Sequence, residues 1–237
     1  MSVSVAVVGA NGALGSAFIK EYMSDPNIDK IYALSRVKPD YFNNKVIWSH
    51  IDYFSEESII AASDIIKDKL DCIIVASGIL HTNTIQPEKA LKDISMVSMQ
   101  TVYAANTIAP ALIAKHFLKH LVTDRKAVFT VLSARVGSIS DNHLGGWFSY
   151  RASKAALNMI IKNIAIEYCR FHKNAVITSL HPGTVVSYLS EPFKDKVSPE
   201  KVFTPDFAAK KCLAVIDTLS PQDSGYCFAY DGSKIDP

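Results

Sequence analysis

The sequence predicts an α/β fold in which a parallel sheet is covered by helices on both faces. Short apolar runs rich in β-branched residues alternate along the chain with longer stretches that have helical spacing. The runs are continuously apolar, which is typical of strands buried on both faces of a sheet. No internal repeat, low-complexity tract or linker interrupts residues 1–237, so we expect a single domain.

These patterns assign the elements in order along the chain. Seven apolar runs are the expected strands: Val3–Val8, Ile31–Leu34, Val46–Trp48, Cys72–Ala76, Ala127–Leu132, Val176–Leu180 and Tyr226–Tyr230. The expected helices lie near residues 12–24, 55–68, 91–121, 149–171 and 205–219. The link from Ser35 to Lys45 is too short for a full helix. Ser187–Pro205 contains three prolines and mixed charge, and we interpret it as a lid, a binding loop or a decorative excursion.

Composition excludes several classes of protein. A hydrophobic fraction of 49% with a net charge of +2 is incompatible with a disordered chain. The 25 basic and 23 acidic residues form no long run, so a nucleic-acid partner is not expected. Four scattered cysteines without a CxxC pair indicate neither a disulfide framework nor a metal site. No apolar stretch approaches the roughly 18 residues of a membrane span, and the chain starts in a strand without a cleavable leader. We therefore expect a cytoplasmic protein.

A glycine-rich turn joins the first expected strand to the first expected helix. Glycine permits positive φ, lets the backbone approach a pyrophosphate and allows close packing of helix on strand. The helix N-terminus then offers free N–H groups to phosphate. A plain turn is the alternative, but the position after the first strand favours a dinucleotide site. Its residues are Gly9, Asn11, Gly12, Ala13, Leu14 and Gly15.

The residues that end the second strand bear on which dinucleotide binds. An acidic side chain there would accept hydrogen bonds from a ribose diol and would repel a 2′-phosphate. The chain has Ser35 and Arg36 instead, and a guanidinium pairs with phosphate through two hydrogen bonds. Unless Arg36 is merely a solvated surface cation, the sequence predicts NADP(H) rather than NAD(H).

Tyr150 and Lys154 form a candidate proton-transfer pair. They are four residues apart in a strongly helical segment and therefore share one face. A nearby ammonium stabilises a phenolate and lowers the pKa of tyrosine from its usual value of about 10. Tyr150 is thus a candidate general acid or base for a carbonyl/alcohol pair. Any helix can carry this spacing by accident, so the pair needs support from elsewhere in the chain.

That support comes from the combination of motifs. The turn at Gly9–Gly15, followed about 140 residues later by Tyr150–Lys154, resembles the short-chain dehydrogenase/reductase family. The segments Leu132–Ile139, Gly145–Trp147 and Tyr150–Met159 look most like its C-factor-like branch, named for a bacterial cell–cell signalling protein. The resemblance covers essentially the whole chain. It implies a Rossmann-type, doubly wound sheet of seven parallel strands, and NAD(P)(H)-dependent carbonyl reduction or alcohol oxidation.

The resemblance also implies roles for further residues. Asp52 would hold the adenine amino group. Ala76-Ser77-Gly78 stands where the family has Asn-Ala-Gly, and backbone atoms supply much of that cofactor contact. Pro182-Gly183 matches the segment beside the nicotinamide. There the Val185 main chain would hold the carboxamide, and Ser187 would replace a threonine hydroxyl.

Asn106 lies at the position of the family's catalytic asparagine. Pro110, four residues later, has no N–H, so the carbonyl of Asn106 loses its helical partner. A buried carbonyl without a partner requires water or a side chain. In the family this carbonyl binds a water that connects to the lysine and completes a proton relay. A kink that only shapes helix packing is a compatible alternative.

The match fails at the family's catalytic serine. Aligned through Gly137, that position falls on Ala134, and only Ser133 of the usual serine pair remains. A shift by one residue turns a strand side chain to the opposite face. Either a bulge lets Ser133 face the cofactor, or Ser138 substitutes, or no hydroxyl assists Tyr150. We favour Ser133.

Other side chains carry less weight. His116 and His120 are four apart on a helix without an acidic or cysteine partner at suitable spacing. We expect them at the surface or in a subunit contact rather than at a metal site. Two groups could line a substrate pocket or close an apolar lid, or simply pack in loops: His143, Trp147 and Phe148, and Tyr188, Leu189 and Phe193.

The leading hypothesis is an NADP(H)-dependent oxidoreductase that acts on a small-molecule carbonyl or the matching alcohol. Tyr150 transfers the proton, assisted by Lys154, Asn106 and Ser133. The alternative is a C-factor-like NADP(H)-binding signalling or regulatory protein with little turnover. We also expect a homo-oligomer, most simply a two-fold homodimer, through the helices near residues 94–120 and 150–170, with a higher homo-oligomer as the alternative. The second of these helices is apolar over most of its circumference and must be buried on more than one side.

Overall fold

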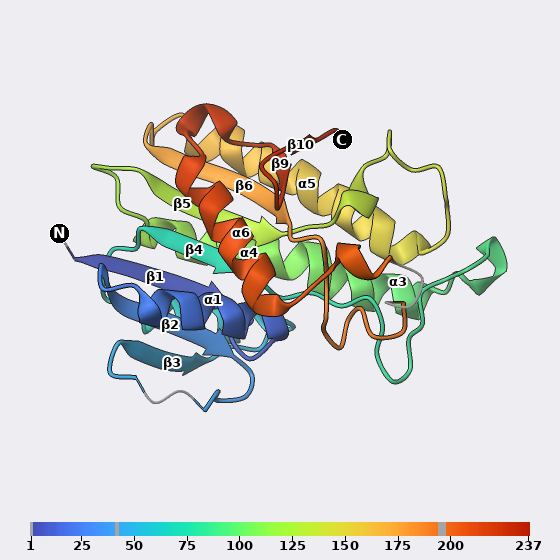
Figure 1. Ribbon diagram of the computed structural model, residues 1–237, viewed down its shortest axis with the longest axis horizontal. Helices are drawn as coiled ribbons and strands as arrows, with labels where there is room; N and C mark the ends of the chain where they lie inside the picture. The colour runs from blue at the N-terminus through green and yellow to red at the C-terminus, as the bar shows by residue number, and fades with distance from the viewer. Residues whose placement is uncertain (1, 41–42, 194–197) are drawn as a thin grey trace.

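An eight-stranded, mostly parallel sheet forms the centre of the computed structural model, which describes residues 2–40, 43–193 and 198–237 (Figure 1). The spatial order of its strands is β10-β9-β6-β5-β4-β1-β2-β3. These strands are β1 (Val3–Val8), β2 (Ile28–Ser35), β3 (Val46–His50), β4 (Cys72–Val75), β5 (Ala127–Leu132), β6 (Ala175–His181), β9 (Cys227–Ala229) and β10 (Lys234–Ile235). The predicted α/β class is confirmed, and the order reverses between β1 and β4, as in Rossmann folds.

The predicted number of seven strands is wrong by one. The first seven strands in this sheet run parallel, whereas β10 pairs antiparallel with β9 at the edge. β10 contains only Lys234 and Ile235, which is too short for any hydrophobic pattern to predict. A separate pair, β7 (Thr184–Val185) with β8 (Val202–Phe203), closes the base of the excursion predicted at Ser187–Pro205.

Helices cover both faces of the sheet. They are α1 (Ala13–Ser24), α2 (Glu56–Asp64), α3 (Met96–Tyr103), α4 (Ala109–Phe117), α5 (Phe148–Tyr168) and α6 (Pro205–Thr218). Helices α1 and α6 pack on one face, where Phe18 and Cys212 meet Val5 of β1. Helices α2, α4 and α5 pack on the other, where Ile113 and Ile161 meet the same strand. Alternate residues of β1 therefore enter different cores, which explains its continuously apolar sequence.

The helix predicted over residues 91–121 is interrupted. A π-helical turn, Ala104–Ile108, separates α3 from α4, and the Ala109 N–H donates to the carbonyl of Ala104. The ring of Pro110 removes one helical donor, and the chain responds by widening by one residue. The prediction of a single long helix is therefore wrong, although proline had indicated where it would deform. Asn106 lies inside the widened turn.

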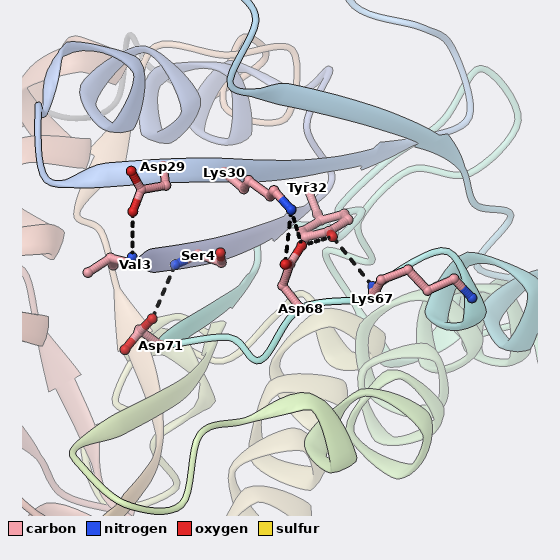
Figure 2. A network of polar contacts seen from close by, with 8 residues as sticks. All are labelled: Val3, Ser4, Asp29, Lys30, Tyr32, Lys67, Asp68 and Asp71. Carbon is pink, nitrogen blue, oxygen red and sulfur yellow. Dashed lines mark hydrogen bonds and ion pairs between the residues drawn. The ribbon is translucent and has the colours of Figure 1, made fainter. Parts of the chain in front are cut away.

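Short 3₁₀ turns and ion pairs complete the framework. The 3₁₀ turns cover Leu91–Asp93, Leu118–His120, Arg135–Gly137, Pro199–Lys201 and Pro221–Asp223. Near the amino ends of β1, β2 and β4, aspartate carboxylates form hydrogen bonds and an ion pair with residues of neighbouring strands (Figure 2). Asp68 binds Lys30 at 2.9 Å and accepts from the Tyr32 hydroxyl at 2.5 Å. Asp71 accepts from the Ser4 N–H and binds Arg125 at 2.7 Å.

Candidate active site

The turn after β1 has the geometry that a bound dinucleotide requires. Gly9 has a φ of +92°, and a Cβ there would lie 2.9 Å from the carbonyl carbon of Ala76. At Gly15 a Cβ would lie 2.1 Å from the carbonyl oxygen of Gly9. Only glycine allows these approaches between turn, β4 and α1. No side chain caps the N-terminus of α1 at Gly12, so its first N–H groups stay free for phosphate.

A cavity of about 840 Å³ opens from this turn across the carboxyl ends of β1, β2 and β4. It is lined by many of the predicted cofactor residues: Gly9, Asn11, Gly12, Ser35, Arg36, Ala76, Ser77 and Gly78. The sequence reasoning missed two aromatic residues of its wall, Tyr53 and Phe54. Their position directly after the third strand was a signal that could have identified them, because parallel strands present their carboxyl ends at one edge.

An unpaired polar atom lies in this cavity. The Ser77 hydroxyl is buried, and no described residue forms a hydrogen bond with it. Buried polar atoms are nearly always paired, so an orphan in a glycine-lined cavity indicates a ligand or water. The cavity, the free α1 N-terminus and Ser77 together fit a nicotinamide dinucleotide.

Ser35, Arg36 and Asp52 take different positions at the adenosine end. The Ser35 hydroxyl is directed inward, donating to the Val37 carbonyl at 2.7 Å and accepting from Trp48 at 3.1 Å. Arg36 is exposed and lies 6.0 Å from the centre of the Tyr53 ring. Asp52 accepts from the Phe54 N–H and does not line the cavity. Of the three, Arg36 is the side chain best placed to meet a 2′-phosphate.

Asn106 and Lys154 lie against Gly78, which lines the cavity. A Cβ on Gly78 would lie 3.2 Å from Asn106 Oδ1 and 3.5 Å from Lys154 Nζ. The Asn106 amide binds both the N–H and the carbonyl of Ile79 at 2.8 Å, and it donates to Ser153 at 3.1 Å. The widened turn therefore ties the loop after β4 to α5, which carries Tyr150 and Lys154. The structure brings three of the predicted catalytic residues into one neighbourhood.

Burial shifts the pKa values of Tyr150 and Lys154 in opposite directions. It raises the pKa of Tyr150 to about 12 and lowers that of Lys154 to about 8. The expected lowering of the tyrosine pKa is therefore wrong for this structure. The Lys154 ammonium lies 5.8 Å from the tyrosine ring centre and donates to the Leu132 carbonyl at 2.8 Å. At neutral pH the phenol is protonated and the ammonium is mostly charged.

The two candidate serines point elsewhere. Ser133 donates to Asn158 Oδ1 at 2.8 Å, and Ser179 donates to the same oxygen at 3.0 Å. Ser138 accepts from the Asp141 N–H at 3.1 Å. Ala134, at the family's serine position, packs with Tyr150 in an apolar cluster. The strand end therefore keeps its alternation, and the bulge that would have turned Ser133 toward the cofactor is not what the structure shows.

The apolar cluster around Tyr150 is built from four loops. Leu80, Ala134 and Tyr150 are its buried members, and Val136, Trp147, Leu189 and Phe193 pack against them. The Trp147 ring lies 4.8 Å from Phe193 and 6.3 Å from Tyr150, measured between ring centres. Tyr188 is exposed, and its ring lies tilted against that of His81 with 4.7 Å between ring centres. The sequence reasoning missed His81. His143 is exposed, and Phe148 is not part of the cluster.

The Pro182–Ser187 segment lies on the short β7–β8 pair. Gly183 has a φ of +80°, and a Cβ there would meet the Phe203 ring at 2.7 Å. The Val185 carbonyl accepts from the hydroxyl of Ser190 at 2.5 Å and from that of Ser187 at 3.2 Å. Both hydroxyls are therefore engaged within the loop itself, and the Val185 carbonyl is occupied.

His116 and His120 tie α4 to α2. The ring of His116 binds Glu56 at 2.8 Å, and that of His120 binds Ser63 at 2.9 Å. Glu56 comes from a helix sixty residues earlier, so no local spacing in the sequence could indicate it as the partner of His116. Within the described part of the chain, no helix is both long and apolar enough to cross a membrane.

Comparisons with known proteins agree with this geometry. A sequence profile described as short chain dehydrogenase matches residues 4–198. An uncharacterised oxidoreductase of Schizosaccharomyces pombe is 27% identical over 97% of this chain and 96% of that protein. C-signal of Myxococcus xanthus is 30% identical over 62% of this chain and 82% of that protein. An NADPH-bound carbonyl reductase from chicken fatty liver has the same fold, with a TM-score of 0.84 and 24% identity over 100% of both chains. With a profile match over most of its length, the chain belongs to the short-chain dehydrogenase/reductase family, an oxidoreductase family that uses NAD or NADP.

Proposed function

We propose that the protein reduces a small-molecule carbonyl with NADPH, using Tyr150 as the proton donor. The observation that carries this proposal is that Gly78, which lines the glycine-turn cavity, lies against the side chains of Asn106 and Lys154. A dinucleotide that entered the cavity at Gly9 would reach the proton-transfer residues beside Gly78. The carbonyl reductase with NADPH bound has the same fold, and this supports the choice of reaction.

The chain offers a binding group for each part of the cofactor. Arg36 would pair with the 2′-phosphate, and the free N–H groups of α1 would bind the pyrophosphate. The Ser77 hydroxyl would gain its missing partner. Lys154 would exchange the Leu132 carbonyl for a ribose hydroxyl, and the segment from Pro182 would lie beside the nicotinamide. When bound, NADPH supplies the hydride that the carbonyl carbon receives.

Tyr150 would complete the reduction by donating its proton to the carbonyl oxygen. Burial raises its pKa to about 12, so at neutral pH the phenol carries the proton that a general acid must donate. None of the described residues forms a hydrogen bond with its hydroxyl, so this group is free for a substrate. Lys154 would stabilise the phenolate left behind, and a water held by the carbonyl of Asn106 would pass a proton from solvent through Lys154 back to the phenolate.

We propose further that Tyr150 works without a serine. The hydroxyls of Ser133 and Ser138 have partners within the fold, and Ala134 presents a methyl group to the cluster around Tyr150. The missing hydrogen bond to the carbonyl oxygen would slow the reaction. One such donor is typically worth about 10²–10³ in rate.

The absent hydroxyl favours a second candidate function, an NADP(H)-binding signalling or regulatory protein with little turnover. The similarity to C-signal over part of the chain supports it. The two candidates share the cofactor and differ in turnover. Neither requires a change in the cavity.

We also propose a homodimer through α4 and α5. Met159 and Ile166 of α5 are 62% and 49% exposed, and Ile108 beside α4 is 52% exposed. Apolar side chains of this size on adjacent helices favour burial against a second copy. Light scattering at micromolar concentration should give twice the mass of the 26.0 kDa chain, and a mass of one chain would contradict the proposal.

A screen of NADPH oxidation against aldehydes, ketones and quinones tests the main proposal, alongside a fluorescence titration of NADPH. Binding with turnover of at least one carbonyl supports reduction. Tight binding without turnover of any carbonyl supports the regulatory candidate. Failure to bind NADPH would overturn both.

A further inference from the structure

Glu88 is a buried carboxylate that the proposed reaction does not use. Its residue is 3% exposed, and it lies in the loop between β4 and α3. One side-chain oxygen accepts from the Ser149 N–H at 3.1 Å, and the other accepts a close hydrogen bond from the Ser149 hydroxyl. The Glu88 main-chain carbonyl accepts from the Trp147 N–H at 2.6 Å. Glu88 therefore holds both residues that flank Phe148, the first residue of α5.

The backbone at Trp147 is strained. Its φ of 50° and ψ of 44° place it in the left-handed region, and it is the only described non-glycine residue with positive φ. The two residues before it are glycines at φ of 62° and 65°, where this conformation costs little. For a bulky residue this conformation is unfavourable, and it persists only where the surroundings enforce it. The Trp147 N–H itself donates to the Glu88 carbonyl, so Glu88 supplies one of the contacts that hold this conformation.

The strained residue forms a wall of the candidate active site. Its indole packs edge-on against Tyr150 and at a tilt against Phe193, within the apolar cluster that surrounds Tyr150. Tyr150 lies only three residues beyond Trp147, in the first turn of α5. The angle between indole and phenol therefore depends on how the start of this helix is fixed.

We propose that Glu88 is a positioning residue: its carboxylate fixes the start of α5 and thereby holds Trp147 against Tyr150. This inference rests on the proposed function. A carboxylate suits the task because its two oxygens satisfy the N–H and the O–H of Ser149 together. It also lies at a helix N-terminus, where a negative charge is favourable. No described residue forms an ion pair with Glu88, so the helix start is what compensates its burial.

The test uses Trp48→Phe as the reference protein, because Trp147 is then the sole tryptophan. Its emission spectrum and near-ultraviolet circular dichroism report the indole environment without any substrate. Each further substitution is compared with this reference in folded, cofactor-loaded protein. Turnover is measured with the best carbonyl from the screen, and kcat and KM are determined separately.

Glu88→Ala should shift the Trp147 emission and lower kcat by about 10- to 100-fold, since small misplacements at an active site cost up to about 10²-fold. The NADPH affinity should stay within about threefold. Glu88→Gln should restore most of both signals, because an amide can still accept from the Ser149 N–H and donate to its hydroxyl. Asp93→Asn is the matched control. It loosens the same loop at Lys89 and Ala90 without touching α5, and should leave both signals unchanged.

Unchanged kcat and emission in Glu88→Ala would overturn the proposal, as would an equal loss in Asp93→Asn. If Glu88→Ala does not fold, Ser149→Ala decides, because it removes one of the two side-chain contacts; unchanged emission and kcat there would also overturn it. If the reference protein reduces no carbonyl, the proposed function fails, and the emission of Trp147 alone then tests the role of Glu88.

Discussion

At the carboxyl ends of its strands the sheet borders a cavity of about 840 Å³, and at the amino ends one of about 560 Å³. Around the amino-end cavity, no buried side-chain polar atom of the described residues lacks a hydrogen-bond partner. The Lys126 ammonium donates to the carbonyls of Ile216 and Asp217 at 2.9 and 2.8 Å, and so completes the C-terminus of α6. In the carboxyl-end cavity the Ser77 hydroxyl has no described partner. The presence of an unpaired buried polar atom, more than the volume of the cavity, distinguishes a candidate binding site from a gap in the packing.

The same contrast extends to the segments around the two cavities. Around the amino ends, Asp68 and Asp71 bind neighbouring strands and loops (Figure 2). Around the carboxyl ends, Gly9 adopts positive φ, Trp147 is strained, and Lys154 is buried at a cost that lowers its pKa. One end of the sheet is arranged for stability. The other carries strain and desolvated charge, which are typical of functional sites.

The largest expected effect is that of Tyr150→Phe, which removes only the transferable proton. Turnover should fall by about 10²–10⁴, the usual contribution of general acid catalysis. The NADPH affinity should stay within a few-fold, because the cavity is unchanged. Stopped-flow reduction and a cofactor titration measure the two quantities. Substantial turnover in this variant would mean that another acid at the carboxyl end does the work.

Lys154 should set the upper pH limit of reduction. Burial lowers its pKa to about 8, whereas Tyr150, with a pKa of about 12, stays protonated. The value of kcat/KM should therefore fall above about pH 8, approaching tenfold per pH unit as the ammonium is lost. In Lys154→Arg the positive charge persists to higher pH, so kcat/KM of the variant should not fall above about pH 8. If kcat/KM of this variant still falls above the same pH, a group other than Lys154 causes the fall.

Arg36 should control the choice between NADPH and NADH. A hydrogen bond to a charged group contributes about 1.5–3 kcal/mol, so Arg36→Ala should lower the ratio of NADPH to NADH affinity by about 10- to 100-fold. Lys20→Ala, which removes an exposed cation from α1, is the control for a general change in charge. The idea fails if the reference protein binds NADH more tightly, or if the two variants behave alike.

Ser133 and Ala134 test whether the site works without a serine. Ser133→Ala should change kcat by less than about threefold, because its hydroxyl serves Asn158. Ala134→Ser should raise kcat by at least about tenfold if the new hydroxyl reaches the carbonyl oxygen. A loss of about 10² in kcat for Ser133→Ala, with little change in KM, would restore the serine role that we favoured from the sequence.

The sequence predicted most of the fold because its signals were local. Apolar runs placed the strands, and the glycine turn placed the cavity. β10 has only two residues, which is too short for a hydrophobic pattern that could predict it. Pro110 indicated where the long helix would deform but not that the deformation would be a π-helical turn. Local patterns also predicted Tyr150, Lys154 and Asn106, whose proximity the structure supports.

Other parts of the site depend on contacts that no local pattern contains. Glu88 meets Ser149 across 61 positions, and His116 meets Glu56 across 60. The face of the sheet to which the Ser133 side chain points depends on whether side chains continue to alternate between the two faces at the end of β5. Side-chain packing decides this. Burial raises the pKa of Tyr150, and the apolar cluster around it includes Leu189 and Phe193 from a distant loop.

The smallest expected effect lies at the amino end. Asp68→Asn weakens the hydrogen bond from Tyr32 and removes the ion pair with Lys30 (Figure 2). The free energy of unfolding should fall by about 1 kcal/mol at pH 7, the usual value for a hydrogen bond with a partly exposed charge. The hydrogen bonds from Tyr32 and Lys30 lower the pKa of Asp68, so its contribution is present above the unfolded pKa of about 3.9 and is lost as pH falls through the lower folded value. The difference between the two proteins in urea denaturation should therefore shrink in acid. Turnover and NADPH affinity should not change, because the substitution lies at the opposite end of the sheet from the site. A change in either would show that the two ends are coupled, and that pairing at the amino end also supports the chemistry at the carboxyl end.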